Sequence, residues 1–371
     1  MDPEQLSAFE ETARRFASNE VAPMVGTEGR DGRLEALPEL FKTAVSVGLV
    51  ASPNPDSPGH EYGVWGKACG EEGPGFSLIL LREIAMACAG VSAGIHFAGL
   101  GAKEAFGMED LPDRAAPAFF EDVWPLSWTA FETPPEGSAR IVQGERLSLT
   151  GGKSFVHCPA GCEGFIVYAS RESKWQMVFL PVDVDGLRIE TLDERMGLAA
   201  LKVVHLSFQD IDVDPRWLIP GADARGLLTR QMLGLSAIAV GNASGALSEA
   251  RRYAGDRFQG GRQIEDHPAV RILIGEAAST IATCALALNA AESMAGGPDE
   301  VLRRAFSLKL RVTTDCCRAV SDLLQVLGGY GYMEDYRLEK RLRDAMTLKT
   351  MSIRPDDLRM LCSAGPGRSG P

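Results

Sequence analysis

Apolar residues recur at helical spacing in two early segments of the chain, residues 6–16 and 37–45. A Gly- and Pro-rich insert at residues 53–75 separates these segments from an apolar stretch at residues 76–107. Glycines interrupt that stretch at several positions, which favours closely packed helices over one long helix. The first third of the chain is therefore predicted to be helical.

The pattern changes in the middle of the chain, where short alternating runs are separated by Gly, Pro and Asp. Three of these runs have the composition and period of β-strands: residues 164–169, 176–181 and 204–209. In the last run Val204, Leu206 and Phe208 would share one face of a sheet. These features predict a β domain.

The helical pattern returns in the final third. Small residues throughout residues 227–257 would permit tight helix packing, and a second long helix over residues 306–327 ends at a pair of glycines. The predicted domains are an N-terminal helical domain (1–123), a middle β domain (124–222), a C-terminal helical domain (223–362) and a disordered tail (363–371). The predicted fold class is α+β.

Composition and charge narrow the possible functions. The chain has 371 residues, of which 45% are apolar and 24% charged, as in ordinary globular proteins. Its formal charge of −12 argues against nucleic acid as the main ligand. No run approaches 18 uninterrupted apolar residues, so no membrane span is predicted, and the acidic N-terminal segment does not resemble a secretory signal.

The eight cysteines show no spacing typical of a disulfide framework, which favours a reduced, cytoplasmic protein. His157, Cys158 and Cys162 form the cluster that most resembles a metal site. Because no second pair of ligands stands nearby in the sequence, a loop with buried thiols is preferred and no metal is predicted.

Six short motifs, in order along the chain, carry a resemblance to a known family. They lie at residues 16–23, 195–198, 208–213, 253–257, 325–332 and 343–345. Together with the helix–strand–helix layout, they make nearly the whole chain similar to the acyl-CoA dehydrogenase family. The resemblance implies an N-terminal α-helical domain, a middle β-barrel-like domain and a C-terminal four-helix bundle. It also implies FAD as cofactor, an acyl-CoA thioester as substrate and an electron-transfer flavoprotein as electron acceptor.

Part of the implied flavin site would be shared between subunits. Arg257, Gln325, Gly328 and Gly329 match family residues that reach the FAD of a neighbouring subunit, which implies a homo- or hetero-oligomer. Glycines let the backbone approach a pyrophosphate closely, and an arginine supplies paired donors for its oxygens.

The sequence departs from the family at two segments expected to contact the flavin. Phe131, Glu132 and Thr133 align with the flavin-binding segment, but Glu132 stands where the family has a threonine, unless a local shift restores Thr133. Ser138, in the same motif, is assigned to substrate binding. Phe155 and His157 stand where the family has an aromatic residue and a threonine beside the flavin ring. His157 would donate a hydrogen bond to flavin N5 or serve as a core residue.

The third departure concerns the catalytic base. Ser352 occupies the position of the usual catalytic Glu, and Gln231 occupies the position that holds the base in a minority of the family. Neither side chain is a base near neutral pH. Asp356, Asp357 and Glu132 are weaker candidates for a relocated base. Three functions stay open: a dehydrogenase with a relocated base, a base-free member performing an elimination, and a partner subunit of a hetero-oligomer.

Overall fold

A computed structural model describes residues 3–25, 34–108, 111–120 and 127–364. The N-terminal part is helical. Its helices are α1 (Pro3–Phe16), a π-helical turn (Ala17–Val21), α2 (Ala22–Val25), α3 (Leu37–Ser46), α4 (Gly59–Tyr62), α5 (Cys69–Glu72), α6 (Gly75–Ala87) and α7 (Ala89–Glu104). Helices α6 and α7 confirm that the apolar stretch forms two packed helices. Helix α6 ends at Ala87, because the backbone of the next residue, Cys88, is extended. The Ser92 hydroxyl of α7 donates to the Leu81 carbonyl of α6 across this junction.

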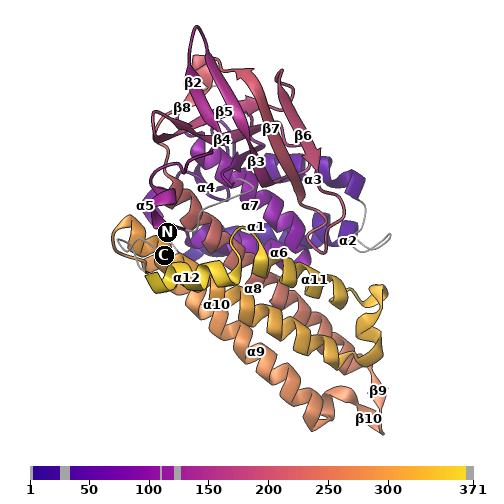
Figure 1. Ribbon diagram of the computed structural model, residues 1–371. Helices are drawn as coiled ribbons and strands as arrows, with labels where there is room; N and C mark the ends of the chain where they lie inside the picture. Colours follow the sequence, from indigo (N-terminus) through magenta and orange to yellow (C-terminus); the bar gives the residue numbers. More distant parts are fainter. Residues whose placement is uncertain (1–2, 26–33, 109–110, 121–126, 365–371) are drawn as a thin grey trace.

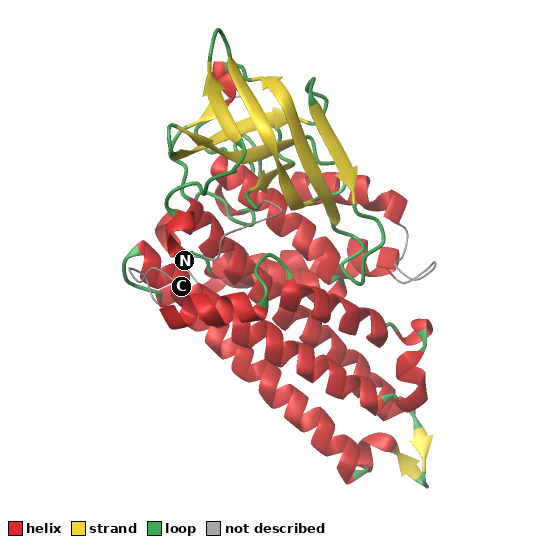
Figure 2. Ribbon diagram, viewed as in Figure 1, coloured by secondary structure: helices red, strands yellow, loops and turns green. Residues whose placement is uncertain are grey.

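The middle of the chain forms a sheet above the helices (Figure 2). Its strands are β1 (Ala115–Ala118), β2 (Arg140–Gln143), β3 (Leu147–Cys158), β4 (Gly164–Arg171), β5 (Lys174–Pro181), β6 (Leu187–Thr191), β7 (Lys202–Asp212) and β8 (Leu218–Ile219). The strand order is β6-β7-β3-β2-β4-β5-β8, and β1 pairs with β4 in parallel. The sheet therefore begins before the predicted boundary at residue 124.

The predicted strands are confirmed in β4, β5 and β7, and the sheet has a core of its own. Val204, Leu206 and Phe208 of β7 are all buried in this core, as their alternation predicts. Its other large members come from the facing strands, including Leu149 and Phe165.

The C-terminal part is a helical bundle below the sheet (Figure 1). It comprises α8 (Ala224–Asp256), a short hairpin of β9 (Phe258–Gln259) and β10 (Arg262–Gln263), α9 (Pro268–Asn289), α10 (Pro298–Val326), α11 (Leu338–Thr350) and α12 (Pro355–Ala364). The tail was predicted to be disordered from residue 363, which is wrong for Ser363 and Ala364 because both continue α12. Residues 365–371 lie outside the described residues.

Small residues bring α8 close to its neighbours, as its sequence predicts. A Cβ added at Gly241 would lie 2.2 Å from the carbonyl oxygen of Arg82 on α6. A Cβ added at Gly234 would lie 2.2 Å from the ring of His96 on α7. Larger residues at these two positions would force the N-terminal helices and the bundle apart.

Helix α9 bears on the expectation that the chain has no membrane span. Among the described helices it is the one long and apolar enough to do so, by length and composition, with 22% of its most apolar window buried. Polar residues such as Arg271 and Glu276 interrupt it, so the helix has no long uninterrupted run of apolar residues. It packs beside α8 and α10 through four buried residues, Ala277, Ile281, Cys284 and Leu288, which is the position of an outer helix of the bundle.

A buried ion pair joins the three parts of the molecule. The Glu104 carboxylate at the end of α7 accepts hydrogen bonds from the Tyr168 hydroxyl on β4 and the Arg230 guanidinium on α8, each at 2.6 Å. Burial and the neighbouring Glu104 carboxylate raise the pKa of Tyr168, so its hydroxyl remains a donor at neutral pH. This shared carboxylate fixes α8 relative to both other parts.

We expect Glu104→Ala to lower the free energy of unfolding by about 3–5 kcal/mol, because it leaves the Arg230 charge buried without its partner. Chemical denaturation followed by circular dichroism measures the change. Glu39→Gln is the control, since the Glu39–Lys42 pair is exposed and should contribute less than about 1 kcal/mol. Equal effects of the two substitutions would contradict this role for Glu104.

Candidate functional site

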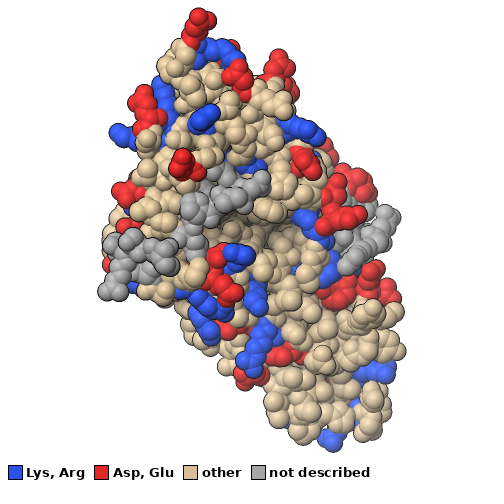
Figure 3. Space-filling view, viewed as in Figure 1, with Lys and Arg blue, Asp and Glu red and all other residues tan. Residues whose placement is uncertain are grey.

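A cavity of about 850 Å³ lies between the sheet and the bundle. Its walls come from the end of β3, the loop between β6 and β7, the last turns of α11 and the start of α12. Figure 3 shows a hollow in this region of the surface, with Lys and Arg side chains near its rim. A volume of this size accommodates a cofactor or a large ligand.

The structure brings the two alternative base positions into direct contact at this cavity. Gln231 on α8 donates its Nε2–H to the Ser352 hydroxyl oxygen at 2.6 Å, although 121 positions separate them in the chain. Gln231 is buried, and Ser352 lines the cavity from the loop between α11 and α12. Both sequence positions therefore face the same point, and neither carries a carboxylate.

None of the three candidate acids stands free as a relocated base. Asp357 lines the cavity, but the Arg354 guanidinium holds both its oxygens at 2.8 and 3.0 Å. The side chain of Asp356 is 88% exposed and pairs with Arg359. Glu132 pairs with Arg225 of α8 at 3.2 Å. Each of the three carboxylates is therefore already engaged by a guanidinium.

The loop that carries Ser352 is held from below by a lysine that the motifs do not reveal. Lys309 of α10 is fully buried, and its Nζ donates to the carbonyls of Lys349 and Ile353 at 2.9 and 3.0 Å. Ser352 lies between these acceptors with a φ of +65°, in the left-handed region. The available sequence signal is that Lys309 interrupts the apolar stripe of α10, where Phe306 and Val312 precede and follow it.

Phe155 and His157 both line the cavity, and their contact with a flavin ring remains a prediction. The Phe155 side chain is 56% exposed with a φ of +52°, so an apolar ring is presented to the cavity at the cost of backbone strain. The His157 ring stacks on Phe97 with centroids 4.9 Å apart. Burial and the nearby Arg195 lower the pKa of His157 to about 3, so the imidazole is neutral at neutral pH.

The segment containing Phe131, Glu132, Thr133 and Ser138 does not line this cavity. Phe131 packs into the core, Glu132 pairs with Arg225, and Thr133 is exposed. Ser138 is buried, and its hydroxyl has no hydrogen-bond partner among the described residues. Attraction between Glu132 and Arg225 draws the segment toward the start of α8, so its predicted contact with flavin and substrate remains a prediction.

The predicted shared residues gather at the end of the bundle near the β9–β10 hairpin (Figure 1). Arg257 follows the last residue of α8 and lies over the ring of Tyr330, 5.5 Å from its centroid. Gly328 and Gly329 begin the next turn, and no atom lies within 4 Å of a Cβ added at either position. Gln325, one turn earlier, is exposed. This surface is open to an external ligand or a second subunit.

The residues present at the cavity fit a flavin. Phe155 supplies an aromatic surface for a flat ring, and His157 supplies a neutral hydrogen-bonding group. Arg195, Lys349 and Arg354 give the wall three cations, which suit the phosphates of a dinucleotide. These five side chains are the ones that would contact FAD in this cavity.

The cysteines and histidines do not form a metal centre. Within the described ranges, no group of three or more His, Cys, Asp or Glu side chains is placed to hold a metal ion. Cys162 donates to the Gly164 carbonyl, and a hydrogen bond with Cys162 together with burial raises the pKa of Cys158. Both are free thiols.

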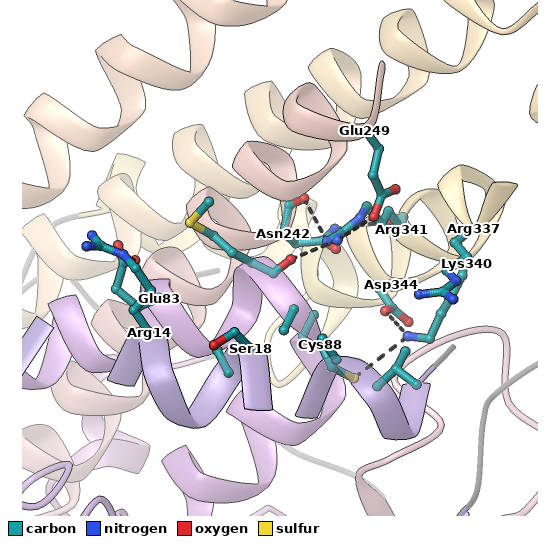
Figure 4. A pocket seen from close by; sticks show the side chains of 16 residues that line it. Arg14, Ser18, Glu83, Cys88, Asn242, Glu249, Arg337, Lys340, Arg341 and Asp344 are labelled. Carbon is teal, nitrogen blue, oxygen red and sulfur yellow. Dashed lines mark hydrogen bonds and ion pairs between the residues drawn. The ribbon is translucent and has the colours of Figure 1, made fainter. Parts of the chain in front are cut away.

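A second cavity, of about 330 Å³, lies on the other side of α11 (Figure 4). Arg341 crosses it, donating to the Met86 carbonyl and to the Glu249 carboxylate. Asp344 lies between the two cavities, since it accepts from Lys340 Nζ on this side and from the Leu198 backbone N–H on the other. Helix α11 is therefore held from both sides by charged hydrogen bonds.

Two of the motifs hold each other in place. Arg343 donates to the Met196 carbonyl at 3.0 Å, and Asp344 accepts from the Leu198 N–H at 2.6 Å. A Cβ added at Gly197 would lie 2.5 Å from the Arg343 carbonyl oxygen. The loop at residues 195–198 and helix α11 thus form one cavity wall, and Gly197 allows their close approach.

We expect Gly197→Ala to destabilise the protein by about 1–3 kcal/mol, because the new methyl group collides with backbone rather than with a flexible side chain. Gly275→Ala is the matched control: a Cβ there meets nothing within 4 Å, and the change should stabilise α9 by up to about 1 kcal/mol. Thermal unfolding of the two variants should show shifts of opposite sign. A neutral or stabilising Gly197→Ala would refute the close contact.

Comparisons with known proteins agree with this geometry. Residues 222–352 match the family model for the acyl-CoA dehydrogenase C-terminal domain. Acryloyl-CoA reductase (NADH) of Anaerotignum propionicum is 24% identical over 90% of this chain and 87% of its own length. The caffeyl-CoA reductase-Etf complex subunit CarC of Acetobacterium woodii is 27% identical over 55% of this chain, so the match spans 56% of that protein.

Solved structures show the same fold over almost the whole chain. Butyryl-CoA dehydrogenase from Megasphaera elsdenii superposes with a TM-score of 0.79 at 18% identity, covering 98% of this chain and 99% of that one. A glutaryl-CoA dehydrogenase from Mycobacterium smegmatis in complex with FADH2 gives 0.80 at 14% identity, covering 98% and 94%. Residues 222–352 therefore belong to the acyl-CoA dehydrogenase C-terminal domain family, and the whole chain has the fold of the acyl-CoA dehydrogenases.

Proposed function

We propose that this protein is an FAD-dependent oxidoreductase acting on the Cα–Cβ bond of an acyl-CoA thioester, with a site that lacks the usual carboxylate base. The contact between Gln231 and Ser352 carries the proposal. The contact joins the two positions at which the resemblance predicts a base, and both side chains in it are neutral.

When bound, FAD would supply hydride-accepting chemistry at the substrate Cβ. The residues of the chain would do the rest. Phe155 and His157 would contact the flavin ring, and Arg195, Lys349 and Arg354, which line the same cavity, would neutralise phosphate charge. The Ser352 hydroxyl and the Gln231 amide orient the acyl group through hydrogen bonds without accepting its α-proton. Absence of a positioned base lowers the rate by about 10²–10⁴-fold.

A second candidate is a partner subunit of a hetero-oligomer. Arg257, Gln325, Gly328 and Gly329 are exposed and unobstructed, whereas Glu132 is paired away from the cavity. A subunit that completes the flavin site of its neighbour but has an altered site of its own would have both the exposed Arg257 surface and the displaced Glu132. An elimination without a base is compatible with the cavity, but no feature of the described residues favours it.

We further propose an oligomeric, cytoplasmic protein with an electron-transfer flavoprotein as its electron acceptor. The exposed Arg257 surface supports assembly. For the acceptor, the relative CarC is by its name a subunit of a complex with Etf. The free cysteines support a reducing compartment.

We expect the purified protein to be a dimer or tetramer, because the surface around Arg257 and the Gly pair contains open donors that a single chain leaves unused. Light scattering at micromolar concentration measures the mass, and the visible spectrum gives the FAD content per chain. Arg257→Ala should weaken assembly or flavin retention, with Arg216→Ala, an exposed arginine of the β domain, as control. A monodisperse wild-type monomer would exclude the shared site.

We expect saturated acyl-CoA esters such as butyryl-CoA to bleach bound flavin at no appreciable rate, since neither Ser352 nor Gln231 takes up a proton. Stopped-flow absorbance measures the reduction. Ser352→Glu restores a carboxylate and should raise the rate if the chain holds its own FAD. Wild-type reduction at tens per second would prove that a base exists, and Asp357→Asn would then test whether Asp357 is that base.

A further inference from the structure

Lys309 supports the loop that carries Ser352 from within the core, and the family-like motifs do not include it. Its side chain is fully buried, although lysine is among the residues least often buried. Its Nζ makes two hydrogen bonds, both to backbone carbonyls that bracket Ser352 in the chain, those of Lys349 and Ile353. A buried amine that reaches two carbonyls on either side of one residue fixes the position of that residue.

The bracketed loop needs such support. Ser352 has a φ of +65°, which costs a non-glycine residue on the order of 1–3 kcal/mol. The Lys349 carbonyl belongs to the last turn of α11, where carbonyls have no partner within the helix. Without Lys309 these two acceptors would be buried and unpaired, and the strained loop would relax.

We propose that Lys309 is a positioning residue: it sets the loop at residues 351–353 so that the Ser352 hydroxyl meets Gln231 and faces the ligand cavity. The proposal rests on the acyl-CoA function proposed above. Lys309 does not contact the cavity itself, so it acts through the loop.

The environment of Lys309 also makes its charge sensitive to pH. The groups facing Nζ are the Lys349 carbonyl of α11 and the Ile353 carbonyl of the loop before α12, whereas the Thr313 hydroxyl of α10 bonds the backbone carbonyl of Lys309. No acid among the described residues offsets the burial, which lowers the pKa of Lys309 to about 7 from an ordinary 10.5. The folded protein therefore loses this proton at a lower pH than the unfolded chain. The wild type should gain stability as pH rises from about 7 toward 10.5.

The test compares Lys309→Met, which keeps the apolar stem, and Lys309→Arg, which keeps a permanent charge and the donors. We expect Lys309→Met to speed amide hydrogen exchange at Ile353, whose N–H bonds the Met351 carbonyl at 2.8 Å, by about tenfold or more. It should also weaken butyryl-CoA binding in isothermal titration about tenfold. Thr313→Val is the control, because the Thr313 hydroxyl bonds within α10 and not to the loop.

Lys309→Arg should fold and protect the loop, but its stability should lack the wild-type rise between pH 7 and 10.5. If Lys309→Met does not fold, the protection of the loop in Lys309→Arg alone tests whether Lys309 positions the loop. Unchanged Ile353 exchange in folded Lys309→Met, or an unprotected loop in Lys309→Arg, would overturn the proposal. If the wild type binds neither FAD nor butyryl-CoA, the proposed function fails, whereas the exchange experiment still reports on Lys309.

Discussion

The arrangement of the three parts of this molecule depends on one buried carboxylate. Glu104 ends α7, and it bonds to Tyr168 in the sheet and to Arg230 in the bundle. A buried carboxylate is tolerated when hydrogen-bond donors satisfy its oxygens. The positions of Tyr168 and Arg230 relative to Glu104 are therefore restricted. Because Gln231 is the next residue after Arg230, the same contact that joins the parts also helps to hold Gln231 against Ser352.

The site that results is polar and neutral where the chemistry of the family requires a base. Gln231 donates to Ser352, and Asp357, the one acid among the described residues of the cavity wall, is held by Arg354 at both oxygens. His157 is neutral but buried, so it would hold a proton poorly. The cavity is thus suited to binding an anionic cofactor and a polar ligand, while proton abstraction has no evident agent.

Local patterns predicted the elements well but not the contacts among them. Alternation in β7 and small residues in α8 are visible in the sequence, because each reports the face or the close approach of a single element. Helix α9 was not predicted as a separate helix, since its apolar residues are spread around it instead of marking one face. The pairing of Glu132 with Arg225 and the contact between Gln231 and Ser352 join distant segments. No local pattern encodes such contacts.

The motifs that make this chain similar to its family are, at two places, residues that hold the fold together. Asp344 bonds to the backbone of Leu198, and Gly197 admits the Arg343 carbonyl. Lys309 lies outside the motifs and holds the loop that carries Ser352, at the position where the resemblance predicts a carboxylate base. Substituting any of these residues would disturb the packing of α11. A carboxylate base has no such packing role, because it projects into a cavity, and it can be lost while the fold persists. Similarity to the family is therefore strong evidence for the architecture of this protein and weak evidence for proton abstraction, which has to be judged from the cavity itself.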